Sequence, residues 1–326
     1  MYASVYDREW REDIREDGNF IGGIVMLITA ALTLGFTVLV TVLVLAGVFS
    51  FEQLQRDDLG LGNTGYLLLY MCTYAAFMGL PPLLVCLLFR RRMPRIQPPT
   101  AQMTGGTYAA AFFLGWGGCA VANYVASYVS AILDSFGIMP PDNPTHLEQT
   151  PQSLLLNLAV SAVLPALLEE IAFRKCILGT LQKYGQGIAV VISALLFGVV
   201  HGGISQSVFA FIVGLVLGFV TVKTGNIWTA VAVHFINNAT SVLAEYVTIG
   251  MDETVSGFVY VVVIGIAGVC GMIALFASLL KKSPLFVRSL CPAHTAENCV
   301  GILCGAPLMV IAVILLILRA LYVNIL

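Results

Sequence analysis

Charged residues are scarce in this chain. Only 10% of its 326 residues are Asp, Glu, Lys or Arg, whereas a soluble domain usually carries about 25%. With 59% hydrophobic residues and a mean hydropathy of +0.92, this scarcity excludes an ordinary soluble domain and places the chain in the membrane class. A net charge of -2 leaves no basic face that could neutralise phosphates, so we expect no nucleic-acid partner.

The N-terminus also lacks the marks of a secretory signal. Residues 1–19 are polar and of mixed charge, without a basic start, a short apolar core or a small-residue cleavage site. We therefore expect a cytoplasmic segment over 1–19, followed by a first span that is retained.

Long apolar runs dominate the rest of the sequence. Windows of about 20 apolar residues predict an all-α, polytopic transmembrane helical bundle of about eight to nine spans. The fifth and sixth runs are short and share the turn at Gly202-Gly203, so they could form one hairpin that does not fully cross twice. The nine runs are Phe20–Phe49, Gly65–Phe89, Thr107–Leu133, Asn157–Gln182, Gly187–Ile204, Ser205–Val222, Ile227–Val247, Gly257–Leu280 and Gly301–Val323.

The distribution of Lys and Arg predicts the orientation. Cytoplasmic ends of spans carry an excess of these residues. With the N-terminus inside, only Arg56 and Arg319 fall outside, and Arg174 and Lys175 lie within a run and are not counted. We therefore predict a multi-pass protein of a cell membrane with its N-terminus in the cytoplasm and its C-terminus outside. The inner residues are Arg8, Arg11, Arg15, Arg90, Arg91, Arg92, Arg95, Lys183, Lys223, Lys281, Lys282 and Arg288.

Three charged residues interrupt the fourth apolar run, in the sequence Glu169-Glu170-Ile171-Ala172-Phe173-Arg174. Each charge costs several kcal/mol in hydrocarbon unless it is paired or lines a wet cavity, so such groups point to a functional site. On a regular helix Glu170 and Arg174 share one face, with their β-carbons about 6 Å apart, and can pair. Glu169 is rotated by about 100° and stays available for chemistry. Pro165 can kink the helix nearby.

Two further apolar runs carry polar residues at helical spacing. Phe197-x-x-x-His201 ends the fifth run, and His234-x-x-x-Asn238 lies on the seventh. At 1.5 Å per residue, Glu169 and His201 lie about 21 Å, and His234 about 14 Å, from the inner ends of their runs. These comparable depths permit one buried site built from three helices.

The ordered set Glu-Glu-x-x-x-Arg, Phe-x-x-x-His and His-x-x-x-Asn resembles the CPBP family of intramembrane proteases. This family includes the CAAX prenyl endopeptidases and proteins linked to bacteriocin self-immunity. The resemblance covers about 100 residues, from Asn157 to Glu245. It implies a catalytic core over 151–248. The apolar runs outside this core predict three further segments, which are the N-terminal segment 1–19, N-terminal spans over 20–150 and C-terminal spans over 249–326.

The resemblance also implies roles for the motif residues in peptide hydrolysis. Glu169 would activate water as the general base, held by Glu170 and Arg174. His201 would position the water, whereas His234 and Asn238 would stabilise the oxyanion. The substrate would be a peptide or a membrane protein within the lipid bilayer.

Metal dependence stays open at this point. One Glu and two His are a plausible zinc set, which would be Glu169, His201 and His234. Members of the family are often labelled metalloproteases, but the prenyl endopeptidases favour a metal-free glutamate mechanism. The sequence has no His-Glu-x-x-His helix that would settle the choice. We favour the metal-free mechanism and commit to no cofactor, with zinc as the alternative.

Two non-catalytic readings compete with hydrolysis. The charges of the fourth run could form a buried ion-pair network that fixes helix packing or lines an ion path. His234 and Asn238 could be interhelical hydrogen-bonding groups, worth about 0.6–2 kcal/mol. A membrane scaffold, immunity factor or transporter-like protein could therefore use the same polar cavity for binding alone.

Overall fold

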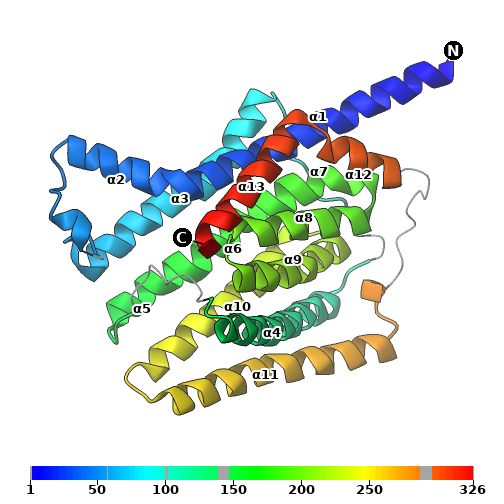
Figure 1. Ribbon diagram of the computed structural model, residues 1–326. Helices are drawn as coiled ribbons and strands as arrows, with labels where there is room; N and C mark the ends of the chain where they lie inside the picture. The colour runs from blue at the N-terminus through cyan, green and yellow to red at the C-terminus, as the bar shows by residue number, and fades with distance from the viewer. Residues whose placement is uncertain (1, 57, 100–101, 139–146, 287–295, 326) are drawn as a thin grey trace.

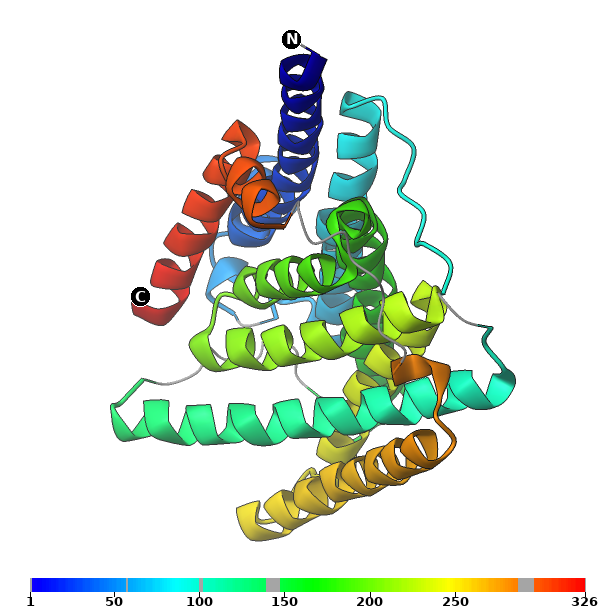
Figure 2. The same ribbon diagram turned by 90° about the vertical axis from the view of Figure 1, so that its right-hand side faces the viewer.

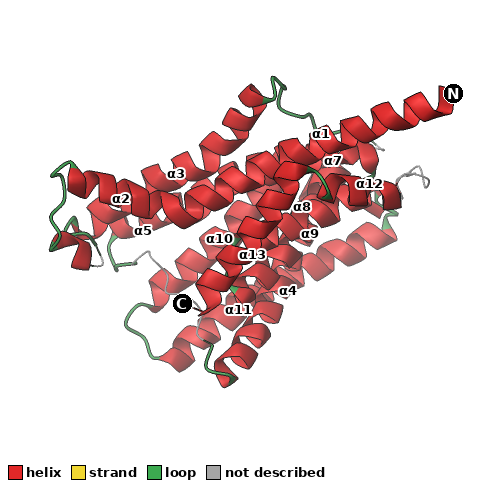
Figure 3. Cartoon of the chain, turned by 45° about the horizontal axis from the view of Figure 1, so that its top comes forward, coloured by secondary structure: helices red, strands yellow, loops and turns green. Residues whose placement is uncertain are grey.

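The computed structural model of the chain describes residues 2–56, 58–99, 102–138, 147–286 and 296–325 (Figure 1). Every regular element in these ranges is helical, and they contain no strand (Figure 3). The predicted all-α, polytopic bundle is thereby confirmed. The principal α-helices are α1 (Tyr2–Ala30), α2 (Phe36–Leu45), α3 (Gly62–Leu88), α4 (Gly105–Ser135), α5 (Pro151–Leu158), α6 (Leu164–Glu169), α7 (Gly179–Leu181), α8 (Gln186–Val200), α9 (Ile204–Thr224), α10 (Ile227–Thr248), α11 (Glu253–Leu280), α12 (Ala296–Cys304) and α13 (Pro307–Ile325).

Eight helical stretches in the described ranges are long and apolar enough to cross a membrane. The fifth predicted run is the shorter helix α8, which has 15 residues and therefore spans only about 22 Å. The first stretch is continuous from α1 through a π-helical segment, η1 (Ala31–Gly35), into α2. The polar residues up to position 19 thus belong to the same helix as the first span.

The first and last long helices cross the bundle in the same direction. Near the start of α13, the amide of Leu308 donates to Asn19 Oδ1 on α1, over 3.0 Å. Further along both helices, Arg319 Nη1 donates to Thr33 Oγ1 over 3.1 Å. The parallel course of α1 and α13 agrees with nine passes through the bundle, which are the eight long stretches and the shorter α8. Arg288, which enters the orientation count, lies outside the described residues.

Polar residues at the helix starts explain several of the observed boundaries. The side chains of Thr104, Asn226 and Asp252 accept hydrogen bonds from backbone amides in the first turns of α4, α10 and α11. Such caps satisfy amides that have no partner within the helix. Gly225 ends α9 in the left-handed region, at a φ of 64°, and lets the chain reverse into α10.

Helices α8, α9, α4 and α11 lie one after another across the bundle (Figure 2). The contact between α4 and α11 includes Gly117 and Gly271. A β-carbon added to Gly117 would lie 2.6 Å from the α-carbon of Gly271. The two backbones therefore touch without an intervening side chain, which only glycine permits here.

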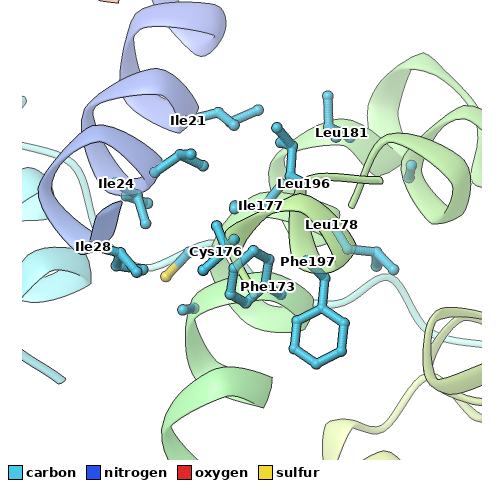
Figure 4. Close-up of a cluster of buried hydrophobic side chains, with 14 of the residues drawn as sticks. Ile21, Ile24, Ile28, Phe173, Cys176, Ile177, Leu178, Leu181, Leu196 and Phe197 are labelled. Carbon is cyan, nitrogen blue, oxygen red and sulfur yellow. The ribbon is translucent and has the colours of Figure 1, made fainter. Parts of the chain in front are cut away.

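The apolar core joins the first helix to the fourth span (Figure 4). Ile21, Ile24 and Ile28, which are spaced along one face of α1, are fully buried against this core. Across from them lie buried side chains of the fourth span and of α8. These are Phe173, Cys176, Ile177, Leu178, Leu181, Leu196 and Phe197. The packing fixes the fourth span, which carries the charged residues, at the centre of the molecule.

Candidate active site

Two π-helical segments interrupt the fourth span. The first, η3 (Ala159–Val163), leads into the short helix α6, and the second, η4 (Glu170–Leu178), follows it directly. The regular α-helix assumed from the sequence is therefore wrong here: Glu169 ends α6 and Glu170 opens a wider helix. Pro165, which cannot donate a backbone hydrogen bond, stands at the start of α6. Wide π-helical turns are rare and occur frequently at functional sites.

Glu170, Arg174 and His234 form a cluster of buried polar side chains. Arg174 Nε lies 3.2 Å from Glu170 Oε2, so the predicted pair is present, and both side chains are fully buried. His234 Nδ1, from α10, lies 3.0 Å from Glu170 Oε1. Within the described part of the chain, Arg174 Nε and Nη1 and Glu170 Oε2 have no aligned hydrogen bond. The ion pair is thus close in distance but incomplete in hydrogen bonding.

The ring of Phe197 packs at the centre of this cluster. The guanidinium carbon of Arg174 lies 4.3 Å from the ring centroid, which is a cation–π arrangement. The rings of Phe173, His201 and His234 lie edge-on to Phe197, at centroid distances of 5.0, 4.9 and 6.2 Å. Phe197 therefore contacts both histidine rings and covers Arg174.

Glu169 differs from its neighbour in partners and exposure. Its side chain remains 8% exposed, whereas Glu170 is 0% exposed. The hydroxyl of Tyr74, from α3, donates to Glu169 Oε1 over 2.5 Å. His234 Nε2 lies 3.7 Å from Glu169 Oε2, beyond hydrogen-bond distance. The imidazole of His234 thus stands between the two carboxylates, with one nitrogen bound and the other facing Glu169.

His201 lies beside the cluster rather than in it. Its Nδ1 is 2.8 Å from the carbonyl oxygen of Phe197, one turn earlier on α8. Among the described residues, no hydrogen bond or ion pair joins His201 to Glu169 or His234. The structure therefore brings four of the six predicted site residues into direct contact and places His201 next to them, against the ring of Phe197.

Asn238, the sixth predicted residue, belongs to a chain of hydrogen-bonded side chains. Its Nδ2 donates to the carbonyl of Ser161 on η3 over 3.0 Å, and its Oδ1 accepts from Asn237. Asn237 in turn accepts from Asn123 on α4, which accepts from the hydroxyl of Tyr260 on α11. The chain fixes the amide of Asn238 from three neighbouring helical elements.

A polar cavity of about 690 Å³ opens beside Asn238, between α4, α5, α9, α10 and α11. Its walls carry mostly hydroxyl and amide groups. Asn238 and Ser161 line it, whereas Glu169 and His234 do not. His234 precedes Asn238 by one turn on the same face of α10, so the cavity ends about 6 Å along the helix from the charged cluster. The lining residues include Asn123, Ser127, Ser130, Asn157, Ser205, Gln206, Asn237, Ser241, Glu245 and Tyr260.

The three residues that the sequence offers as possible zinc ligands, Glu169, His201 and His234, do not form a metal site. No group of three or more His, Cys, Asp or Glu side chains is placed to hold a metal ion in the described ranges. His201 directs Nδ1 to the carbonyl of Phe197 on its own helix. Since Glu169, His201 and His234 form no such group in the described ranges, they do not fit zinc, and we derive no step through a metal.

Four residues that hydrogen-bond at the site or in the chain leading to Asn238 were not identified from the sequence. Tyr74 lies in an apolar run 95 residues before Glu169, and a tyrosine in such a run gives no sign of its partner. Asn237 adjoins a motif position without matching one, and Asn123 and Tyr260 lie outside the motif-bearing runs. The polar type of Asn123 and Asn237 in membrane spans was the only available signal.

Comparisons with known proteins address the segment that carries these residues. Residues 151–240 match the family described as type II CAAX prenyl endopeptidase Rce1-like. All six predicted site residues lie in this range. The resemblance to the CPBP family is confirmed.

A relative from Bacillus subtilis (strain 168), named "Putative membrane peptidase YdiL", is 29% identical over 138 residues. The match covers 42% of this chain and 54% of the relative, so the similarity spans about half of that protein. No solved structure matches the chain significantly. The matched segment includes the fourth span, α8, α9 and most of α10, and the remaining spans lie outside the family match.

Proposed function

We propose that the protein is an intramembrane endopeptidase that hydrolyses a peptide or a membrane-protein substrate by a metal-free, glutamate-dependent mechanism. The observation that carries this proposal is the unequal pair of glutamates. Glu170 is fully buried and paired, whereas Glu169 keeps some exposure and faces His234 Nε2 across 3.7 Å. A carboxylate held in place but not ion-paired by arginine is suited to accept a proton from water.

Charge balance supports a catalytic arrangement. Glu169 and Glu170 bring two negative charges into an apolar surrounding, and Arg174 brings one positive charge. In its imidazolium form, His234 makes the cluster neutral, which lowers the cost of burying these charges together. In that form both ring nitrogens donate, one to Glu170 and the other into the space beside Glu169.

In the proposed reaction, Glu169 takes a proton from water while the water oxygen bonds to the scissile carbonyl carbon. The resulting oxyanion receives hydrogen bonds from the second N–H of Asn238 Nδ2 and from His234 Nε2. When the tetrahedral intermediate collapses, the carbon–nitrogen bond breaks and Glu169 passes its proton to the leaving nitrogen. The products are a carboxylic acid and an amine, and Glu169 regains its starting charge. His201, which packs against Phe197, helps to position the water.

The experiment that tests this function compares wild-type protein with Glu169→Gln, in liposomes, on a quenched-fluorescence peptide library. The substitution keeps the size and hydrogen bonding of the side chain but removes the base. We expect the cleavage rate to fall by about 10²–10⁴-fold. Glu52→Gln, at an exposed residue that pairs with Arg56, serves as the matched control and should cleave normally. Equal cleavage by wild type and Glu169→Gln would refute the assigned base and move attention to Glu170.

We also propose that the N-terminus is cytoplasmic, the C-terminus lies outside, and the membrane is a cell membrane. The parallel course of α1 and α13 supports opposite sides for the two ends. Asp17 pairs with both Arg91 and Lys183, so these three residues lie at the same end of the bundle. This supports the common cytoplasmic side that the sequence predicts for the ends of their three spans. A fluorescent protein fused to the N-terminus should be fluorescent, and alkaline phosphatase fused to the C-terminus should be active. Both ends on one side would contradict nine crossings.

A further inference from the structure

The polar cavity lies at the end of the bundle opposite Asp17. Its wall includes Ser130 near the end of α4 and Ser205 near the start of α9, which share a hydrogen bond of 2.6 Å. In Figure 1 these helix ends lie away from the N-terminus. Hydroxyl and amide groups that line a space within a membrane bundle can hydrogen-bond water or a peptide backbone, neither of which hydrocarbon accommodates. The cavity is therefore suited to hold an extended peptide.

One face of α10 forms a continuous wall of this cavity. Asn238, Ser241, Val242 and Glu245 all line it, and their spacing of three, four and seven residues places them on a single helix face. Glu245 is the only side chain with a formal charge among the described residues that line the cavity, and it makes no ion pair in that part of the chain. A carboxylate here, among neutral polar groups, favours a positively charged partner.

We propose that the cavity binds the peptide substrate and that Glu245 selects a Lys or Arg side chain in it. This inference rests on the proposed endopeptidase function. Glu245 lies seven residues beyond Asn238, which is about 10 Å along α10. An extended peptide advances about 3.3 Å per residue, so the selected side chain lies about three positions from the scissile bond. Glu245 is thus a specificity-determining residue, remote from the bond that breaks.

The test measures cleavage of three peptide sets that differ only in Lys, Gln or Glu at the third position on either side of the scissile bond. We expect wild type to prefer Lys over Gln by about fivefold in kcat/KM, the upper range for a solvent-accessible ion pair. Glu245→Gln should abolish this preference, and Glu245→Lys should shift it toward Glu. Glu253→Gln, a matched loss of charge outside the cavity at the start of α11, should retain the Lys preference. An unchanged preference in Glu245→Gln would overturn the proposal.

A binding measurement separates failure of this inference from failure of the proposed function. Fluorescein-labelled peptides with one Lys or one Glu are titrated against Glu169→Gln and against Glu169→Gln with Glu245→Gln, and fluorescence anisotropy is recorded. Tighter binding of the Lys peptide that depends on Glu245 supports the cavity as its site, even if wild type cleaves nothing. Equal binding of the two peptides by Glu169→Gln would overturn the inference, even if wild type is a protease. Size-exclusion profiles of all variants confirm that each is folded.

Discussion

Two groups of buried carboxylates in this protein use opposite arrangements. At the predicted inner end of the bundle, Asp17 is 1% exposed and accepts from Arg91 Nη1, Lys183 Nζ and the Tyr184 hydroxyl, at 2.5, 2.7 and 2.7 Å. The side chains of Arg91 and Lys183 remain 31% and 49% exposed. Asp17 thus has three direct partners, and its cationic partners still reach solvent.

The cluster around Glu169 and Glu170 is more deeply buried, apart from the residual exposure of Glu169, and it is less completely hydrogen-bonded. Arg174 is fully buried, and two of its nitrogens have no aligned hydrogen bond within the described ranges. A satisfied buried network stabilises a fold, whereas unused hydrogen-bonding capacity is costly unless something else draws on it. The comparison indicates that the Asp17 group holds helices together, whereas the incomplete hydrogen bonding of the Glu169 group is not explained by stability alone and agrees with the proposed catalytic role.

Removing Arg174 should produce the largest effect. Arg174→Met leaves Glu170 buried without its cationic partner, and breaking a buried pair typically costs about 3–5 kcal/mol. We expect the free energy of unfolding, measured by denaturant titration in detergent, to fall by this amount. The double variant Glu170→Leu with Arg174→Met removes both charges and should regain part of the loss. An unchanged free energy of unfolding in Arg174→Met would show that the pair with Glu170 does not stabilise the fold.

Asp17→Asn should separate stability from chemistry. The substitution weakens three charge-assisted contacts between α1, the end of α3 and the end of the fourth span, each worth about 1.5–3 kcal/mol before solvent screening. Because Arg91 and Lys183 reach solvent, we expect a net loss of only about 1–2 kcal/mol in the free energy of unfolding. The cleavage rate per folded molecule should not change. A rate that falls while folding is unaffected would contradict a purely structural role for Asp17.

Tyr74→Phe should have the smallest effect on stability and a selective effect on rate. It removes only the hydroxyl that donates to Glu169, so we expect a loss of about 1 kcal/mol in the free energy of unfolding. Since the carboxylate then loses one of its fixed contacts, kcat should fall by about tenfold with KM nearly unchanged. Tyr70→Phe, on the same helix with its ring stacked on Tyr74, is the matched control. Equal kcat in Tyr74→Phe and wild type would exclude a positioning role for the hydroxyl.

The main features of the fold could be predicted from the sequence because hydropathy reports directly on membrane spans. The apolar runs and the short fifth segment follow from apolar length, and the parallel ends agree with the placement of Lys and Arg. The expectation of a short sixth segment was wrong, because α9 has 21 residues and is long enough to cross a membrane. The π-helical segments η3 and η4 could not be predicted, since apolar residues all around a span carry no signal of helix type. The role of Asp17 in holding helix ends together could not be predicted either. Nothing in the sequence distinguishes it from the other acidic residues of the polar N-terminal stretch.

The site was predictable to the extent that its residues share a helix with their partners. The pairing of Glu170 with Arg174 follows from a spacing of four residues, and the structure has it. Contacts between distant helices, such as Tyr74 with Glu169 or Tyr260 with Asn123, depend on helix rotation and depth, which one sequence does not encode locally. Asn238 illustrates both cases: its motif position was recognised, but its bond to the Ser161 carbonyl required the structure.

The glycine contact between α4 and α11 has a consequence for the size of the cavity. Asn123 and Tyr260, which lie on these two helices and line the cavity, are about 9 and 16 Å along the helices from Gly117 and Gly271. Because the backbones touch at the glycines, a methyl group added there would meet backbone atoms rather than a movable side chain. It would therefore push the two helices apart. The width of the cavity therefore depends on two glycines that do not line it. A substitution at either glycine can change this width from a position remote from the cavity.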